Sequence, residues 1–446
     1  MKKLSYLDQG FLSLETENHP LHVGTVQLYS LPSSDPEGMS IADTLWDYLK
    51  SRSPFNLKLK NRFFIPLRQD WVIANGLSRK HHFKFHNSIN SFQDVVSKVE
   101  ALHEERLNRK QPLWEIHFFP IKKEKQLAAY FKIHHACMDG IAGMRLLNGF
   151  LSSSKGSSPA YTSETQEEKK YNTFDLVLDD IKELVLNKTG PIIEIIQNYS
   201  MAAAEQKDPE RLRPLPFTAP DSVLNEKFTS KRRFEFLTVD LNPLKPIRKE
   251  LDATVNDLIL ILCASALRSY LLQKQALPAE PLVAAVPASV RSDKTADGNQ
   301  IGFLRVNLAT NNASSKARVT KILESIKAAK GQLSSLSANA LTTDAELVFM
   351  LGTLANATGT LRYLPPIHSL VISNVPIARR KLFLGDARLE SSYPISALPP
   401  SQGLNISVFS YENQLDFGLL AAAEVLPDLQ LLKSSLEKAY QELISG

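Results

Sequence analysis

The sequence is poor in cysteine: its 446 residues include two, Cys137 and Cys263. Neither belongs to a C-x-x-C pair. Isolated cysteines of this kind are typical of reduced thiols in a cytosolic protein, so we expect a cytoplasmic chain without disulfides.

Long apolar runs are also missing. The longest, Leu258–Leu267, is closed by Arg268. A bilayer span takes about 20 apolar residues, so this run predicts a buried helix instead. Residues 1–8 carry an acid where a signal peptide needs an apolar core, and we therefore expect no targeting segment.

Several common catalytic signatures are absent. The sequence contains no G-x-S-x-G, G-x-x-x-x-G-K-[ST], G-x-G-x-x-G or H-E-x-x-H pattern. Hydrolase, nucleotidase, dehydrogenase and zinc-protease functions therefore lack their usual motifs. We expect no bound metal and no resident cofactor.

The composition that is present describes a globular protein. Hydrophobic residues make up 43% of the chain and charged residues 22%, which is enough apolar material for two cores at this length. The net charge of +5 is compatible with an anionic partner, such as a nucleotide-bearing substrate or an acidic membrane surface. We expect no nucleic-acid partner.

Strand and helix patterns alternate in both halves of the chain, which predicts two layered α/β domains. Strands are predicted at 22–31, 126–134, 233–240, 281–287 and 302–309, with a hairpin over 404–421. Helices are predicted at 41–51, 95–109, 141–151, 174–186, 254–270 and 429–443. We place an N-terminal domain at 1–205 with a polar loop at 152–172, a linker at 206–220 that is rich in proline and charge, and a C-terminal domain at 221–446.

The strongest candidate site is the sequence HHACMDG, residues 134–140, at the predicted junction of a strand and a helix. An imidazole titrates near neutrality, so His134 or His135 could take a proton from a hydroxyl and later release it. Asp139 and Gly140 suit a tight turn, which the aspartate could lock through a salt bridge.

Three other interpretations of this motif remain open at this point. The histidines could be polar residues at a strand end without further role. They could bind a metal, although adjacent strand residues point to opposite faces. Cys137 could be a nucleophile, but its neighbours are not electropositive. A second pair, His81-His82, has no Asp-Gly after it, so the seven-residue context carries the signal.

HHACMDG matches the HHxxxDG motif of acyltransferases that resemble chloramphenicol acetyltransferase and the condensation domains of peptide synthetases. The whole chain resembles the bacterial wax ester synthase/acyl-CoA:diacylglycerol acyltransferases. The segments that carry this resemblance are LDQGFLSLE (7–15), PLHVG (20–24), QPLWEIH (111–117), HHACMDGIAGMRL (134–146), TVNDLIL (254–260), EPLVAAVPASVR (280–291), GNQIG (298–302), VISNVP (371–376) and LNISVFSY (404–411). One departure is Ile377-Ala378 after SNVP, where the family usually has Gly-Pro.

The resemblance implies an α/β fold of two chloramphenicol-acetyltransferase-like domains, each a mixed sheet with flanking helices, that meet at a tunnel. It implies transfer of a long-chain acyl group from acyl-CoA, as co-substrate, to a fatty alcohol or diacylglycerol. The implied catalytic residues are His135 as general base, His134 and Asp139. We expect Asp139 to act structurally, in an ion pair with Arg291, and Gly140 to lie at the substrate.

Other residues of the resembling motifs have two possible roles each. Asn256 could face the tunnel, or it could belong with Asp257 to the capped start of a helix. Ser373 and Asn374 could donate hydrogen bonds in the tunnel or form a turn before Pro376. Trp114 is expected to be a packing residue.

Two alternatives to this function remain: an acyltransferase with another acceptor, such as an amine or a polyketide hydroxyl, and a non-catalytic lipid-binding protein. Acting on lipids without a spanning segment would require a peripheral position on the inner membrane or on lipid inclusions such as droplets. The amphipathic segment 174–186 and the basic cluster Lys231–Arg233 are the candidate contacts.

Overall fold

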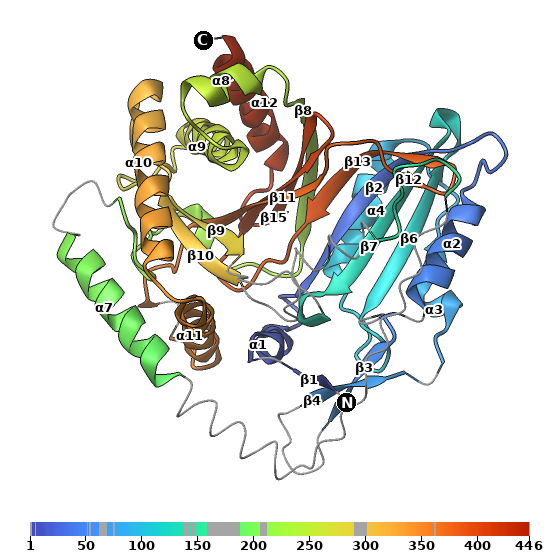
Figure 1. The fold of residues 1–446 in the computed structure, drawn as a ribbon, viewed down its shortest axis with the longest axis horizontal. Coiled ribbons are helices and arrows are strands. Elements are labelled where there is room, and N and C mark those ends of the chain that lie inside the picture. The colour runs from blue at the N-terminus through green and yellow to red at the C-terminus, as the bar shows by residue number, and fades with distance from the viewer. Residues whose placement is uncertain are drawn as a thin grey trace.

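The computed structural model describes most of the chain, in two halves that lie side by side (Figure 1). The described residues are 2–4, 6–50, 52, 55–61, 69–74, 76–137, 143, 149–157, 188–205, 212–289, 301–360 and 363–445. The predicted helices at 141–151 and 174–186 fall largely or wholly outside these ranges.

The first half is built on a six-stranded sheet whose middle was predicted correctly. Its order is β12-β13-β2-β7-β6-β5. Four strands of this sheet come from the first part of the chain: β2 (His22–Ser30), β7 (Gln126–His134), β6 (Trp114–Ile121) and β5 (Phe83–Phe85). β7 pairs antiparallel with both β2 and β6, and β5 runs parallel to β6. The predicted strands at 22–31 and 126–134 are confirmed as β2 and β7.

Two strands of this first sheet come from the far end of the chain. β13 (Ala387–Ile395) pairs antiparallel with β2, and β12 (Phe383–Leu384) adds to its outer edge. Figure 1 shows β13, in orange, beside β2, in blue. Residues 383–395 therefore complete the sheet of the first half although they lie beyond the predicted linker. A single cut in the sequence does not separate the two sheets.

The second half contains a mixed sheet in the order β10-β9-β11-β14-β15-β8. Its strands are β8 (Arg232–Asp240), β9 (Val283–Ser289), β10 (Ile301–Asn307), β11 (Leu370–Ala378), β14 (Leu404–Tyr411) and β15 (Gln414–Ala422). β11 runs parallel to β9 and β14, and the other pairs are antiparallel. The two mixed sheets confirm the predicted α/β class.

The helix α9 (Val255–Gln273) is the buried helix that the apolar run predicted. Thr254 accepts from the backbone N–H of Asp257 and Asp257 accepts from that of Thr254, so the predicted capping box is present. By length and composition α9 is the one helix of the described residues that could cross a membrane, yet 67% of its most apolar window is buried inside the protein.

The remaining helices cover the sheets or lie between them. α12 (Leu429–Ser445), α10 (Ser315–Ser334) and α8 (Leu244–Glu250) pack on α9. α4 (Phe92–Glu104) lies between β7 and β8, and its Val99 shares one core cluster with Leu258 of α9. α2 (Met39–Leu49) packs on the opposite face of the first sheet, against Phe131 and Ile133 among others. One continuous core therefore joins the two halves.

Smaller elements complete the described chain. α1 (Tyr6–Leu14) lies between the halves and contacts α11 (Ala338–Ala357), which in turn packs on α7 (Thr189–Glu205). α3 (Arg79–His82) precedes β5. A three-stranded sheet is formed by β1 (Lys2–Lys3), β4 (Gln69–Ile73) and β3 (Leu57–Asn61).

Near the end of β13, the two sheets approach closely. A Cβ atom added to Gly418 of β15 would lie 1.8 Å from the carbonyl oxygen of Pro394, so no side chain fits there. Beside it, the fully buried Asp416 accepts hydrogen bonds from the backbone N–H of Ser392 at 2.9 Å and from the Thr238 hydroxyl at 2.6 Å. This carboxyl group ties β13 to the second sheet.

The Asp416 contact makes stability depend on pH. Burial raises the pKa of Asp416 from 3.8 to about 6, and its hydrogen bonds oppose that rise only in part. The folded state thus binds this proton more tightly than the unfolded state, so its stabilising contribution is complete below pH 4 and is lost as pH rises through 6. We expect the unfolding free energy of the wild type, minus that of Asp416→Asn, to fall by on the order of 2 kcal/mol between pH 4 and 7. Denaturant unfolding across this range measures it, and parallel pH profiles for the two proteins would contradict it.

Candidate active site

The two histidines of the motif lie at the end of β7, where the strand gives way to the short turn His135–Cys137. The backbone N–H of His134 donates to the carbonyl of Leu113 at 3.0 Å, and that of His135 donates to the carbonyl of Leu21 at 3.0 Å. Neighbouring segments on both sides of β7 therefore hold the backbone of the pair in place.

His134 points into the protein and is fully buried. Its Nδ1 accepts a hydrogen bond from the backbone N–H of Ala136 at 3.1 Å, and its Nε2 lies 3.4 Å from Oε1 of Glu15. Because Nδ1 is an acceptor, the proton of a neutral ring is on Nε2 and faces the carboxylate. His134 thus fixes the turn on which His135 stands.

Glu15, just beyond the end of α1, anchors this arrangement. Its carboxylate accepts from Nη2 of Arg109 at 2.9 Å and from Nε of Arg109 at 3.1 Å. Arg109 also donates to the carbonyl of Leu12 at 2.6 Å, in the last turn of α1. Burial alone would raise the pKa of Glu15, but His134 and Arg109 lower it to about 2. Glu15 is therefore a buried anion at neutral pH.

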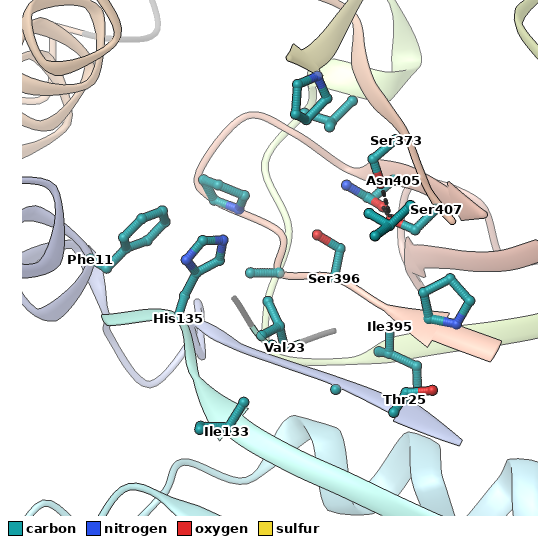
Figure 2. Close-up of a pocket in the computed structure, with 18 of the residues that line it drawn as sticks. Phe11, Val23, Thr25, Ile133, His135, Ser373, Ile395, Ser396, Asn405 and Ser407 are labelled. Atoms are coloured by element: carbon teal, nitrogen blue, oxygen red, sulfur yellow. Dashed lines mark hydrogen bonds between the residues drawn. The ribbon is translucent and has the colours of Figure 1, made fainter. Parts of the chain in front are cut away.

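His135 points the other way, into a cavity, and its ring is held by stacking. The imidazole lies against the ring of Phe11 from α1, with ring centres 3.9 Å apart and planes 15° apart (Figure 2). Phe11 also contacts Phe349 of α11, at a ring-centre distance of 4.8 Å. Elements of both halves therefore set the plane of this imidazole.

The cavity beside His135 has a volume of about 310 Å³ and lies between the two halves. Val23, Ile133 and Ile395 line it from the first sheet (Figure 2), and Phe409 lines it from β14 of the second sheet. The wall is mostly apolar, as a site for hydrocarbon chains requires. It lies where the resemblance implied a tunnel.

One wall of the cavity carries a row of polar side chains. The Ser373 hydroxyl of β11 donates to Oγ of Ser407 at 2.8 Å, and Ser407 donates to Oδ1 of Asn405 at 2.7 Å, both on β14 (Figure 2). Asn374 faces away and accepts from the Ser410 hydroxyl at 3.0 Å. Ser373 thus reaches the cavity, whereas Asn374 does not.

SNVP is not the turn that was considered for it. These residues lie within β11, and the strand has an irregularity between Pro376 and Ala378 that accommodates the proline. The departure Ile377-Ala378 from the family pattern falls at this irregularity.

The other predicted residues have varied places. Trp114 is buried, and its Nε1 donates to the carbonyl of Phe55 at 2.8 Å. It also borders the cavity, so it is both a packing residue and part of the cavity wall. Asp257 caps α9. Asn256 is half-buried in the first turn of α9 and is not among the residues that line the cavity. Three residues, Asp139, Gly140 and Arg291, lie outside the described residues, so their proposed ion pair and substrate contact stay predictions.

The competing interpretations of the motif find no support in its surroundings. Burial raises the pKa of the Cys137 thiol well above its usual value, which disfavours a thiolate nucleophile. Among the described residues no group of three or more His, Cys, Asp or Glu side chains could hold a metal ion. His82, of the second pair, stacks on Trp114 with ring centres 4.0 Å apart, and burial lowers its pKa to about 4.

Sequence reasoning missed Glu15, Arg109 and Phe11 as parts of the site. Two of them, Phe11 and Glu15, belong to the segment 7–15 that carried part of the resemblance, so that segment was the available signal. Arg109 lies just before the segment 111–117. Their roles depend on which strands and helices meet, and this is not visible in the segments themselves.

Comparison with known proteins identifies the family of this chain. The sequence model of the wax ester synthase/diacylglycerol acyltransferase catalytic domain matches residues 4–259, and that of the C-terminal domain of the same family matches residues 297–444. The O-acyltransferase WSD of Acinetobacter baylyi is 32% identical over 99% of this chain and 96% of its own.

Solved structures extend the comparison to three dimensions. The wax ester synthase/diacylglycerol acyltransferase of Marinobacter aquaeolei VT8 superposes with a TM-score of 0.76 at 29% identity, covering 99% of this chain and 98% of that one. The starter condensation domain of rhizomide synthetase, at 12% identity, covers 100% of this chain and 94% of that one with a TM-score of 0.63, which shows a shared fold. With both family domains matched in order along the chain, the chain is a member of the wax ester synthase/diacylglycerol acyltransferase family of acyltransferases.

Proposed function

We propose that this protein transfers a long-chain fatty acyl group from acyl-CoA to the hydroxyl of a fatty alcohol, of diacylglycerol or of both. The observation that carries the proposal is the position of His135, on the wall of an apolar cavity shared by the two halves. The WSD relative is named an O-acyltransferase, and the family is named for wax ester and diacylglycerol substrates.

The chemistry needs one base. His135 accepts the proton of the acceptor hydroxyl, and the oxygen attacks the thioester carbonyl. A C–O bond forms, the C–S bond breaks, and the proton on His135 passes to the leaving CoA thiolate. No acyl-enzyme is required, because a thiolate is a good leaving group. Base catalysis of this kind supplies roughly 10²–10⁴-fold, and positioning supplies much of the rest.

The polar row on the cavity wall suits the charge that develops on the carbonyl oxygen. The hydroxyls of Ser373 and Ser407 donate their hydrogen bonds within the row, and Oδ1 of Asn405 is the last acceptor. The Asn405 side-chain N–H groups have no partner within the part of the chain that the structure describes. Pre-aligned donors of this type stabilise an oxyanion strongly in a site that excludes water.

A thiol-release assay tests the function directly. With palmitoyl-CoA and either hexadecanol or diacylglycerol, we expect CoA release that depends on the acceptor. CoA release with an amine or a polyketide hydroxyl, but not with these alcohols, would show that the protein acylates a different class of acceptor. No release with any acceptor, together with binding of lipid, would indicate a non-catalytic lipid-binding protein.

Substitutions separate the roles of the two histidines. We expect His135→Ala to lose roughly 10²–10⁴-fold in turnover with little loss of stability, because this ring faces the cavity. His134→Ala should cost less activity and more stability, roughly 1–3 kcal/mol, since it leaves the Ala136 N–H without its acceptor and removes one of the partners of Glu15. Turnover and thermal unfolding measure the two effects. His81→Ala is the control, and a comparable loss of turnover there would show that the wrong pair was chosen.

We also propose that the protein works from a peripheral position on a membrane or lipid inclusion in the cytoplasm, because its acceptors are insoluble in water. α7 exposes Ile193, Ile196 and Met201, and α11 exposes Met350, Leu351 and Leu354. These two helices pack together, and the opposite side of α11 lines the cavity with Ala345, Val348 and Phe349. The candidate segment 174–186 lies outside the described residues. The basic residues Lys231 and Arg233 are partly engaged by Glu104 and Glu100.

Co-sedimentation with anionic vesicles at low and high salt tests this position. We expect binding at low salt that weakens at high salt. The double change Ile196→Ser with Leu354→Ser should reduce it, because both side chains are exposed, at 59% and 60%. Leu431→Ser on α12 is the matched control, 41% exposed and on a different helix. No binding at low salt would refute the proposal, and binding that resists high salt would mean that apolar insertion dominates.

A further inference from the structure

A second polar group borders the same cavity, away from the row on β11 and β14. Arg305 of β10 lines the cavity and is 9% exposed. His368, just before β11, and Gln402, just before β14, line it too. A guanidinium in an otherwise apolar wall is costly unless its N–H groups are satisfied, so its partners decide what it does.

The protein partners of Arg305 come from the helices α11 and α7. Its Nη2 is 3.5 Å from Oδ2 of Asp344 on α11, and the other oxygen of Asp344 accepts from the hydroxyl of Tyr199 on α7. The Tyr199 ring centre is 6.0 Å from the guanidinium carbon. A guanidinium has five N–H groups, and the Asp344 contact uses one of them, so Arg305 brings further hydrogen-bond donors to the cavity that it lines.

His368 adds an uncharged polar group beside it. Burial lowers the pKa of His368 to about 4, and the charge on Arg305 contributes to that direction, so the ring is neutral at pH 7. Its Nε2 is buried and has no hydrogen-bond partner within the described residues. A buried polar atom without a partner in a cavity wall is a place where a substrate atom can bind.

The charges indicate which kind of atom fits. The positive charge of Arg305 and the negative charge of Asp344 nearly cancel, so the pair has little net charge with which to bind a second anion such as a phosphate. N–H donors beside a neutral ring suit an uncharged oxygen acceptor. We infer that Arg305 and His368 form a subsite that binds a carbonyl oxygen of the substrate, away from the reacting thioester. This inference rests on the proposed acyl transfer.

The subsite is separated from His135 by a short part of α11. Asp344 precedes Phe349 by five residues, about 7.5 Å of helix. Phe349 contacts Phe11, which stacks on His135. The bound carbonyl therefore lies several bonds from the reacting atoms. Two substrates carry such a group: diacylglycerol, in its ester carbonyls, and acyl-CoA, in the amides of its pantetheine arm. A fatty alcohol carries none.

The test uses Arg305→Met and Arg305→Lys in the full chain, with three kinetic arms. The arms vary diacylglycerol at fixed palmitoyl-CoA, hexadecanol at fixed palmitoyl-CoA, and palmitoyl-CoA at fixed hexadecanol. We expect Arg305→Met to lose about tenfold to a hundredfold in kcat/KM in one arm, which corresponds to one charged hydrogen bond. Arg305→Lys should restore part of it. Arg388→Met is the matched control, because this arginine of β13 pairs with Glu412 and does not line the cavity.

The outcomes identify the source of the carbonyl. A selective loss for diacylglycerol, with hexadecanol unchanged, assigns the subsite to the acceptor ester. A raised KM for palmitoyl-CoA with hexadecanol as acceptor assigns it to the pantetheine amides. Partial unfolding of the variant does not mimic either result. The KM for palmitoyl-CoA, and the ratio of kcat/KM for diacylglycerol to kcat/KM for hexadecanol, do not depend on the fraction of protein that is folded. If the wild type is active and Arg305→Met has the same kcat/KM as the wild type in all three arms, the subsite is overturned and the proposed function stands. A wild type without activity overturns the proposed function.

Discussion

A buried carboxylate, that of Glu15, joins the elements around the histidine pair at one end of the first sheet. It receives Arg109 on one side and His134 on the other, and Leu21 N–H lies 3.4 Å from it. These contacts join the end of α1, the start of β2 and the end of β7. Because α1 also carries Phe11, the same anchor that sets the backbone of the histidine pair sets the ring that stacks on His135. A charge this deep is tolerable only with all of these partners.

The cavity owes its chemistry to the contrast between its walls and its few polar groups. Apolar side chains from both sheets exclude water, which strengthens every hydrogen bond that remains inside. The row from Ser373 to Asn405 and the group around Arg305 are both contributed by the second half. The proposed base, His135, comes from the first. Neither half lines the whole cavity by itself, so the proposed reaction depends on the relative position of the two halves.

The parts of this structure that the sequence predicts are those encoded locally. Strand alternation located β2 and β7, and the Thr254–Asp257 capping box marked the start of α9, because neighbouring residues decide both. The role of Glu15 was hidden, since its partners lie 94 and 119 positions away in the sequence, at Arg109 and His134. Pro376 suggested a turn because proline removes a ladder donor, yet an irregular register lets β11 continue. The partner of β2 across 365 residues could not be found from either strand alone.

That long-range pairing also sets the order in which the protein can assemble as it is synthesised. Until residue 395 has left the ribosome, β2 has no neighbour on its outer side, and its backbone N–H and C=O groups form an open edge. Such edges invite pairing with other chains, which is the usual start of aggregation. More than three quarters of the polypeptide must therefore be made before the first sheet is complete. For most of its synthesis, the nascent chain exposes an unpaired strand edge to which other chains can bind.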